Sequence, residues 1–177
     1  VLPTHRVVRG LGEAGLAALD AGLPALFEVE VADPAAVVGR FAAAGGLAGG
    51  EGRFGLVTRS GARLLRARRD AFAPLVTGGT AARELDVALL GAALERLAGI
   101  DAAATAGGQR ITYTKSAAEA ATLVEAGTDG ADAAFLLEPT PVASILEVAR
   151  AGDVMPQKST YFFPKAPTGL VLNPHEW

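Results

Sequence analysis

Two short segments, one near each end of the chain, gather the side chains that could do chemistry. The later segment, Met155–Lys165, places two lysines, two short hydroxyls, a glutamine and three aromatic rings around two prolines. Ammonium groups and short hydroxyl donors suit a phosphate or a carboxylate. We therefore take Lys158, Ser159, Thr160 and Lys165 as candidate ligand-binding residues. The alternative is a proline-rich turn that enters an aromatic strand, with its lysines simply solvated.

The earlier segment is the triplet Thr4-His5-Arg6, which apolar residues flank on both sides. That pattern indicates a strand, or the end of one, that presents the triplet. His5 and Arg6 could hold an anion or assist a proton transfer. The alternative is a structural histidine beside a surface arginine. We take all three residues as candidate ligand-binding residues.

Helical and strand periodicities predict the elements that must position these segments. Apolar spacing predicts a helix over 11–21 that stops at Gly22, and a core helix over 85–97 that ends at Gly99. Capping signals predict three more helices, which begin at Pro34, Ala117 and Val142. Alternating or continuous apolar residues predict strands over 26–31, 53–58, 62–67, 109–115, 132–137 and 169–172.

The strands over 53–58 and 62–67 form a predicted hairpin around Ser60-Gly61. Five arginines between Arg59 and Arg69 make this region the most basic. Aromatic residues hardly interleave with them, which argues against single-stranded nucleic acid. The glycine-rich run 45–52 lacks the lysine and hydroxyl residue of a phosphate loop, so we interpret it as a flexible connection.

Helices and strands alternate, but the hairpin breaks strict βαβ regularity. We predict an α/β fold: a mixed β-sheet with helices packed on it, in a single domain over residues 1–177 that includes a β-hairpin and a terminal strand pair. The sequence shows no internal repeat. It begins without an initiator methionine, so we expect it to be a fragment or a processed product.

Composition narrows the class of protein. Half of the residues are hydrophobic, but no apolar run approaches the roughly 20 residues that a membrane-spanning helix needs. Cysteine is absent, which fits a cytoplasmic protein. His5 and His175 are too far apart in sequence to form a local metal motif, so we predict no metal site. A net charge of -3 argues against a DNA-binding domain.

Four segments taken together resemble a prokaryotic family called domain of unknown function 1015. They are the segments 2–8, 85–87, 133–142 and 155–165 with 169–171. The resemblance is to the family's C-terminal portion and spans essentially the whole chain, so we expect the chain to be the C-terminal part of a longer protein. The family's N-terminal portion is similar to the ParB and sulfiredoxin-like fold, and this sequence lacks it. The resemblance implies that the two polar segments complete a ligand cleft against that N-terminal domain, which would be the chain's partner.

Three functions follow as hypotheses. The first is part of a cleft for a phosphate, a nucleotide such as ATP or ADP, or a phosphorylated metabolite, in a reaction like that of a kinase, where positioning and charge neutralisation do most of the work. The second is a structural or oligomerisation domain without its own activity. The third is a ParB-like module that binds nucleic acid. No residue is assigned a catalytic role, and whether the chain is an enzyme stays open.

Overall fold

A computed structural model describes residues 1–42 and 50–165. The elements are, in chain order, β1 (His5–Arg9), α1 (Gly12–Leu26), β2 (Phe27–Ala32), α2 (Pro34–Ala42), β3 (Arg53–Thr58), β4 (Gly61–Ala67), α3 (Arg69–Phe72), α4 (Thr80–Arg83), α5 (Asp86–Ala98), α6 (Ala102–Ala106), β5 (Ile111–Thr114), α7 (Ala117–Ala126), the 3-10 turn η1 (Thr128–Gly130), β6 (Ala131–Leu137) and α8 (Val142–Arg150).

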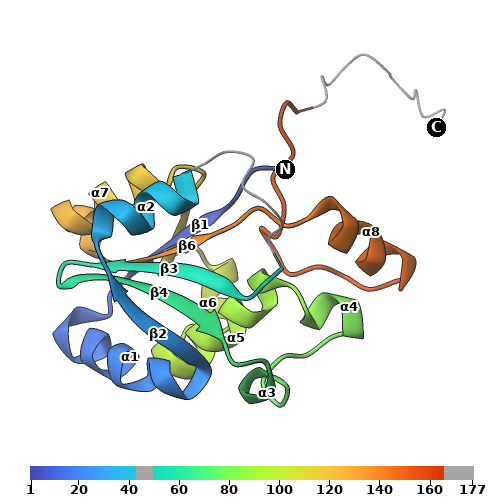
Figure 1. Ribbon diagram of the computed structural model, residues 1–177, viewed down its shortest axis with the longest axis horizontal. Helices are drawn as coiled ribbons and strands as arrows, with labels where there is room; N and C mark the ends of the chain where they lie inside the picture. The colour runs from blue at the N-terminus through green and yellow to red at the C-terminus, as the bar shows by residue number, and fades with distance from the viewer. Residues whose placement is uncertain (43–49, 166–177) are drawn as a thin grey trace, which may run out of the picture.

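A six-stranded sheet in the order β2-β4-β3-β6-β1-β5 forms the middle of the molecule. Helices α2 and α7 cover one face, while α1 and α5 cover the other (Figure 1). Each face has its own apolar cluster. The α1/α5 side is the larger and includes Phe27, which meets the rings of Phe54 and Phe72 edge-on. The predicted α/β class, with helices packed on a sheet, is confirmed.

Strand direction differs from the expected mixed sheet, because all five strand pairings in the described ranges are antiparallel. A helix does connect β2 to β3, and another connects β5 to β6, as in parallel units. In each case, however, another strand lies between the two: β4 between β2 and β3, and β1 between β5 and β6. The strands joined by a helix therefore run parallel without touching, and antiparallel partners separate them.

The two halves of the sheet share one topology, although the sequence shows no repeat. One half runs β2-α2-β3-β4-α5, and the other consists of β5-α7-β6 completed by β1 and α1. Helices α2 and α7 lie on the same face, and α1 and α5 lie together on the opposite face. The fold is thus two βαββα units that meet at the β3–β6 pairing. In the second unit, the third strand and the last helix come from the beginning of the chain.

Several local signals determine the elements as the sequence predicts. The hairpin pairs Thr58 with Gly61 across its turn. Gly99 ends α5 with a left-handed φ of 62°, and the Ser116 hydroxyl caps α7 by accepting the N–H of Glu119. Strand β6 is buried at every position, which confirms the prediction of a central strand from its continuous apolar run.

The helix predicted over 11–21 is longer than expected, because α1 continues through Gly22 and Pro24 to Leu26. Gly22 lies where α1 meets α5: an added Cβ would be 2.5 Å from a methyl of Leu97. Close packing therefore explains this glycine, rather than a helix stop. The short helices α3, α4 and α6 were not predicted, since none is long enough to show a period. The predicted final strand over 169–172 and most of the glycine-rich run lie outside the described residues.

Two buried carboxylates, Asp132 and Asp86, hold segments that are distant in the sequence. Asp132 on β6 accepts the N–H groups of Leu11 and Gly12 at 2.7 and 3.2 Å, so it caps the beginning of α1. Asp86, in the first turn of α5, accepts the N–H groups of Gly50 and Gly52 at 2.8 and 2.9 Å. Both carboxylates thus satisfy backbone donors from distant segments, a structural role that explains their burial.

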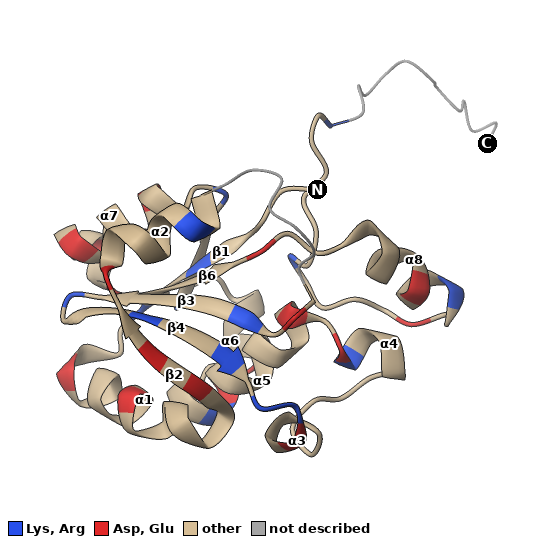
Figure 2. Ribbon diagram, in the orientation of Figure 1, with Lys and Arg blue, Asp and Glu red and all other residues tan. Residues whose placement is uncertain are grey.

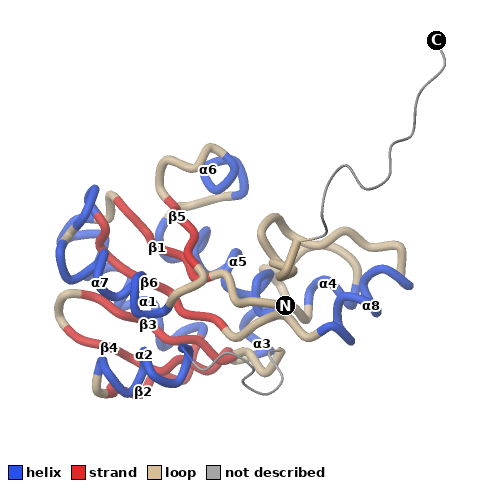
Figure 3. Tube along the Cα trace, turned by 90° about the horizontal axis from the view of Figure 1, so that it is seen from above, coloured by secondary structure: helices blue, strands red, loops and turns tan. Residues whose placement is uncertain are grey.

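The polar segments predicted from sequence come together at one end of the sheet. The N–H of Leu2 donates to the carbonyl of Tyr161 at 2.8 Å, which pairs the first residues of the chain with the segment after α8. Figure 3 shows α4 and α8 side by side beyond the strands, with the following loop returning past the N-terminus. Within the ranges 1–42 and 50–165, no helix is both long and apolar enough to cross a bilayer.

Candidate anion-binding site

The sequence contains three lysines, and each lies either against the ring of Tyr161 or in the wall of the pocket that this ring lines. The ammonium group of Lys115 lies 4.0 Å from the centre of the Tyr161 ring, and that of Lys165 lies 4.9 Å from it. Lys158 lines the same pocket as Lys115 and Tyr161. Cations this close to an aromatic face are attracted to its π electrons. The ring thus holds two of the three ammonium groups beside one cavity, which we call the lysine pocket.

The lysine pocket has a volume of about 400 Å³ and lies against the edge strand β5. The backbone pairing between Leu2 and Tyr161 positions Thr4 and Thr160 in its wall, so two hydroxyl groups accompany the ammonium groups. The pKa of Tyr161 lies below its usual value, because Lys115 hydrogen-bonds its hydroxyl and adds positive charge, with a smaller effect from Lys165. The pocket therefore combines concentrated positive charge with short hydroxyl donors.

Ser159 supports this pocket from behind rather than lining it. Its side chain is buried, and its hydroxyl donates to the carbonyl of Pro156. Its own carbonyl accepts the hydroxyl of Thr140 at 2.7 Å. The preceding residue, Lys158, has a left-handed φ of 58°, which is uncommon outside glycine and asparagine. These contacts define a tight turn, and the turn brings Lys158 to the cavity.

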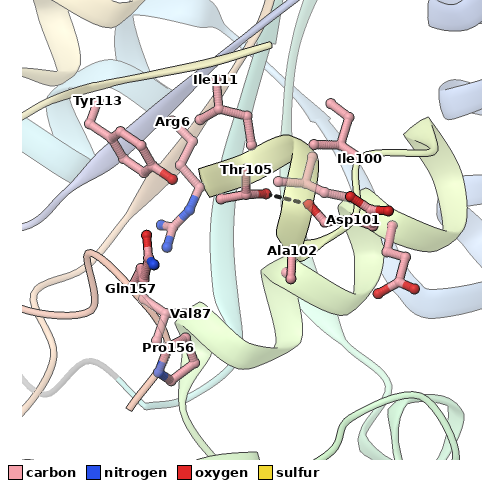
Figure 4. A pocket seen from close by; sticks show the side chains of 13 residues that line it. Arg6, Val87, Ile100, Asp101, Ala102, Thr105, Ile111, Tyr113, Pro156 and Gln157 are labelled. Atoms are coloured by element: carbon pink, nitrogen blue, oxygen red, sulfur yellow. Dashed lines mark hydrogen bonds between the residues drawn. The ribbon is translucent and has the colours of Figure 1, made fainter. Parts of the chain in front are cut away.

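Arg6 lies in an adjoining pocket on the α5 side of the sheet. In Figure 4 its guanidinium extends between the phenol of Tyr113 and the amide of Gln157. The guanidinium lies 5.7 Å from the centre of the Tyr113 ring and donates to the carbonyl of Thr4 at 3.2 Å. Burial lowers the pKa of Arg6 to about 10, so the group stays charged at neutral pH. Tyr113 lines both pockets, so they are neighbours.

His5 is completely buried on the other face of the sheet, the face that α2 and α7 cover. Side chains alternate along β1, so the residue next to Arg6 points away from it. The Nδ1 atom of His5 accepts the N–H of Leu137 at 3.1 Å. Burial, with the positive charge of Arg6, lowers the pKa of His5 to about 4, so the ring is neutral. The structure does not bring His5 to the lysine pocket.

Arginines differ from lysines in their surroundings. Five ion pairs are present among residues 1–42 and 50–165, and each uses an arginine: Arg9–Asp129, Arg53–Glu51, Arg59–Asp132, Arg63–Asp20 and Arg69–Glu84. Figure 2 shows the acidic strand β2 beside basic positions of β3 and β4. Three of the five pairs use arginines between Arg59 and Arg69, so part of the charge of this basic region is compensated. The lysines make none of the ion pairs just named.

Sequence reasoning missed Lys115 and the two tyrosines of the site. Lys115 is the last residue of the segment predicted as a strand, more than forty positions before Lys158. One signal in the sequence could have pointed to Lys115: a chain with thirteen arginines and only three lysines uses lysine selectively. Of the seven predicted residues, three line the lysine pocket: Thr4, Lys158 and Thr160. Lys165 lies against the ring of Tyr161, and Arg6 lines the adjoining pocket.

No three histidine, aspartate or glutamate side chains lie close enough to hold a metal ion within the described ranges. No family model matches the chain, and comparisons with curated proteins and with solved structures give no match either.

Proposed function

We propose that the lysine pocket binds the phosphate group of a small molecule, such as a nucleotide or a phosphorylated metabolite. The observation that supports this proposal is that the chain's three lysines gather at one place, two against the Tyr161 ring and Lys158 in the wall of the same pocket. Like charges repel when they are gathered, and within residues 1–42 and 50–165 no ion pair includes one of these lysines, so the cluster favours an anionic occupant. Ammonium groups bind phosphate as point charges, while the hydroxyls of Thr4 and Thr160 supply directional donors.

Two exposed rings next to the pocket favour a nucleotide over bare phosphate. Phe162 and Phe163 expose 54% and 69% of their surface and lie between Tyr161 and Lys165 in sequence. Aromatic rings beside basic residues bind nucleobases by stacking. A kinase-like reaction, a cytoplasmic location and completion of the cleft by an N-terminal domain of the 1015 family all stay predictions that accompany this proposal.

Calorimetric titration with phosphate, pyrophosphate, ADP and ATP tests the proposal. We expect affinity to rise in that order and to fall as salt is added, because exposed charges are screened. Each of Lys115→Gln, Lys158→Asn and Lys165→Gln should weaken binding by about tenfold, the effect of losing one charged hydrogen bond.

Arg150→Gln provides a matched control. Arg150 is an exposed cation at the end of α8, and its removal changes net charge by the same amount as each lysine variant. It should leave affinity within about twofold, since a remote exposed charge contributes little. If Arg150→Gln weakened binding as much as the lysine variants, the effect would come from overall charge and the pocket would lose its role. Absence of binding by all four ligands would favour the structural-domain hypothesis.

A further inference from the structure

The pocket that holds Arg6 is a second cavity with different chemistry. Its volume is about 230 Å³. Apolar side chains form much of its wall, and Figure 4 shows Ile100, Ile111, Ala102 and Val87 around it. Such a cavity suits a small ligand with an apolar body.

Arg6 supplies one concentrated charge to this cavity. The residue is only 4% exposed, and its guanidinium extends into the pocket (Figure 4). Among the described residues, its one side-chain hydrogen bond is the contact to the carbonyl of Thr4, and none of the five ion pairs includes it. A guanidinium has five N–H donors in a planar fork. A buried cation without a carboxylate partner is costly to maintain, and a bound anion would compensate it.

We propose that this pocket binds a small monocarboxylate with an apolar body, with its carboxylate on Arg6 and the amide of Gln157 or the phenol of Tyr113 beside it. A planar fork matches a carboxylate in two parallel hydrogen bonds. The exposed acids Glu95 and Asp101 also line the cavity, so a multiply charged phosphate would meet repulsion there. The inference does not rest on the phosphate proposal, because the two pockets hold separate ligands.

Glycine 91 offers a way to fill the cavity without touching its charge. It lines the pocket from α5, and an added Cβ would meet no atom within 4 Å. Gly91→Leu therefore adds a bulky apolar side chain to the wall of this cavity. Gly39→Leu is the matched control: Gly39 is also an exposed helical glycine with nothing within 4 Å, but it lies in α2 on the other face of the sheet.

Calorimetry and thermal unfolding with phenylacetate, hexanoate and 2-phenylethanol test the proposal. We expect the two acids to bind and to raise the melting temperature at millimolar concentration, and the neutral alcohol to do neither. Gly91→Leu and Arg6→Gln should each weaken binding of the acids by about tenfold or more, while Gly39→Leu leaves it unchanged.

Three results would overturn it: no binding of either acid, equal binding of the alcohol, or full affinity in Gly91→Leu. If Arg6→Gln failed to fold, binding by Gly91→Leu would still test the proposal. Phosphate titration separates the two proposals, because Gly91→Leu should keep its affinity for ADP and Lys158→Asn should keep its affinity for phenylacetate. If the protein binds ADP but neither acid, the carboxylate proposal is wrong. If it binds the acids but not ADP, the phosphate proposal is wrong.

Discussion

His5 and Arg6 are neighbours in the chain, yet their side chains leave β1 on opposite faces of the sheet. Arg6 lies opposite Tyr113 on β5 and Phe135 on β6, on the face that α5 covers. His5 points toward the α2 and α7 side and binds the backbone of Leu137. The sheet separates the two groups, so one anion cannot contact both. Arg6 faces the cavity between β1, β5 and α5, while His5 joins the beginning of β1 to the end of β6.

Acid should destabilise the protein partly through His5. Its pKa is about 4 when folded and 6.5 ordinarily, so the neutral ring contributes stability that is complete above pH 6.5. That contribution, about 3 kcal/mol, is lost as pH falls through 4, because the unfolded chain takes up the proton first. We expect His5→Gln to be less stable at pH 7 and to lose less stability between pH 6.5 and 4, as measured by urea unfolding.

The comparison between natural chain and variant isolates this effect. Burial raises the pKa of both Asp86 and Glu138, so these two groups act on stability in the opposite direction as the pH falls. Both chains share those carboxyl groups, so their contribution cancels in the difference. Parallel curves of unfolding free energy against pH would contradict the assignment of a buried, neutral His5.

Two substitutions at Lys158 can separate the effect of its charge on phosphate binding from the effect of its backbone conformation on stability. Its φ of 58° suits asparagine but strains a β-branched residue. Lys158→Asn should keep unfolding free energy within about 0.5 kcal/mol, whereas Lys158→Val should lose about 1 to 2 kcal/mol. Both should lose affinity for phosphate equally. Unequal loss of affinity in the two variants would show that turn geometry, not the ammonium group, determines binding.

Asp86 should contribute strongly to stability, because its carboxylate satisfies two buried backbone donors. Asp86→Ala leaves the N–H groups of Gly50 and Gly52 without this partner and should cost about 2 to 3 kcal/mol in urea unfolding. Asp86→Asn keeps one oxygen acceptor and should cost less. Asp70→Ala, which removes an exposed acid from α3, should change stability by no more than about 0.5 kcal/mol. Equal effects at the two sites would contradict the proposed role.

The same substitution should have opposite effects at two glycines. At Gly91 an alanine meets open space in α5 and should stabilise by up to about 1 kcal/mol through helix propensity. At Gly55 in β3, a Cβ would lie 2.8 Å from Val37 and 2.9 Å from the Phe41 ring, which are the two buried side chains of α2. Overpacking there should cost about 1 to 3 kcal/mol. Thermal unfolding of Gly91→Ala and Gly55→Ala measures the two changes in stability. A stabilised Gly55→Ala would show that α2 can move away from β3.

Local patterns in the sequence predict helices, strands and caps better than they predict which of these elements lie side by side. The hairpin, the cap at Ser116 and the stop at Gly99 depend on nearby residues, so their signals are visible in the chain. Strand order depends on which apolar faces meet, and periodicity carries no information on that. The position of Lys115 beside Tyr161 is of this second kind, since it follows from β5 lying at the edge of the sheet next to β1.

Strand β1 also bears on the order in which the chain can assemble. Its partner residues in β5 and β6 lie more than a hundred positions further along, whereas β2, β3 and β4 pair within a short stretch. Pairing of distant residues raises the entropic barrier to folding and slows it. On the ribosome, the unit of β2 to β4 can form while β1 still has no partner. Strand β1 is therefore among the last strands of this sheet to pair, and its apolar valines stay exposed until β5 and β6 have been synthesised.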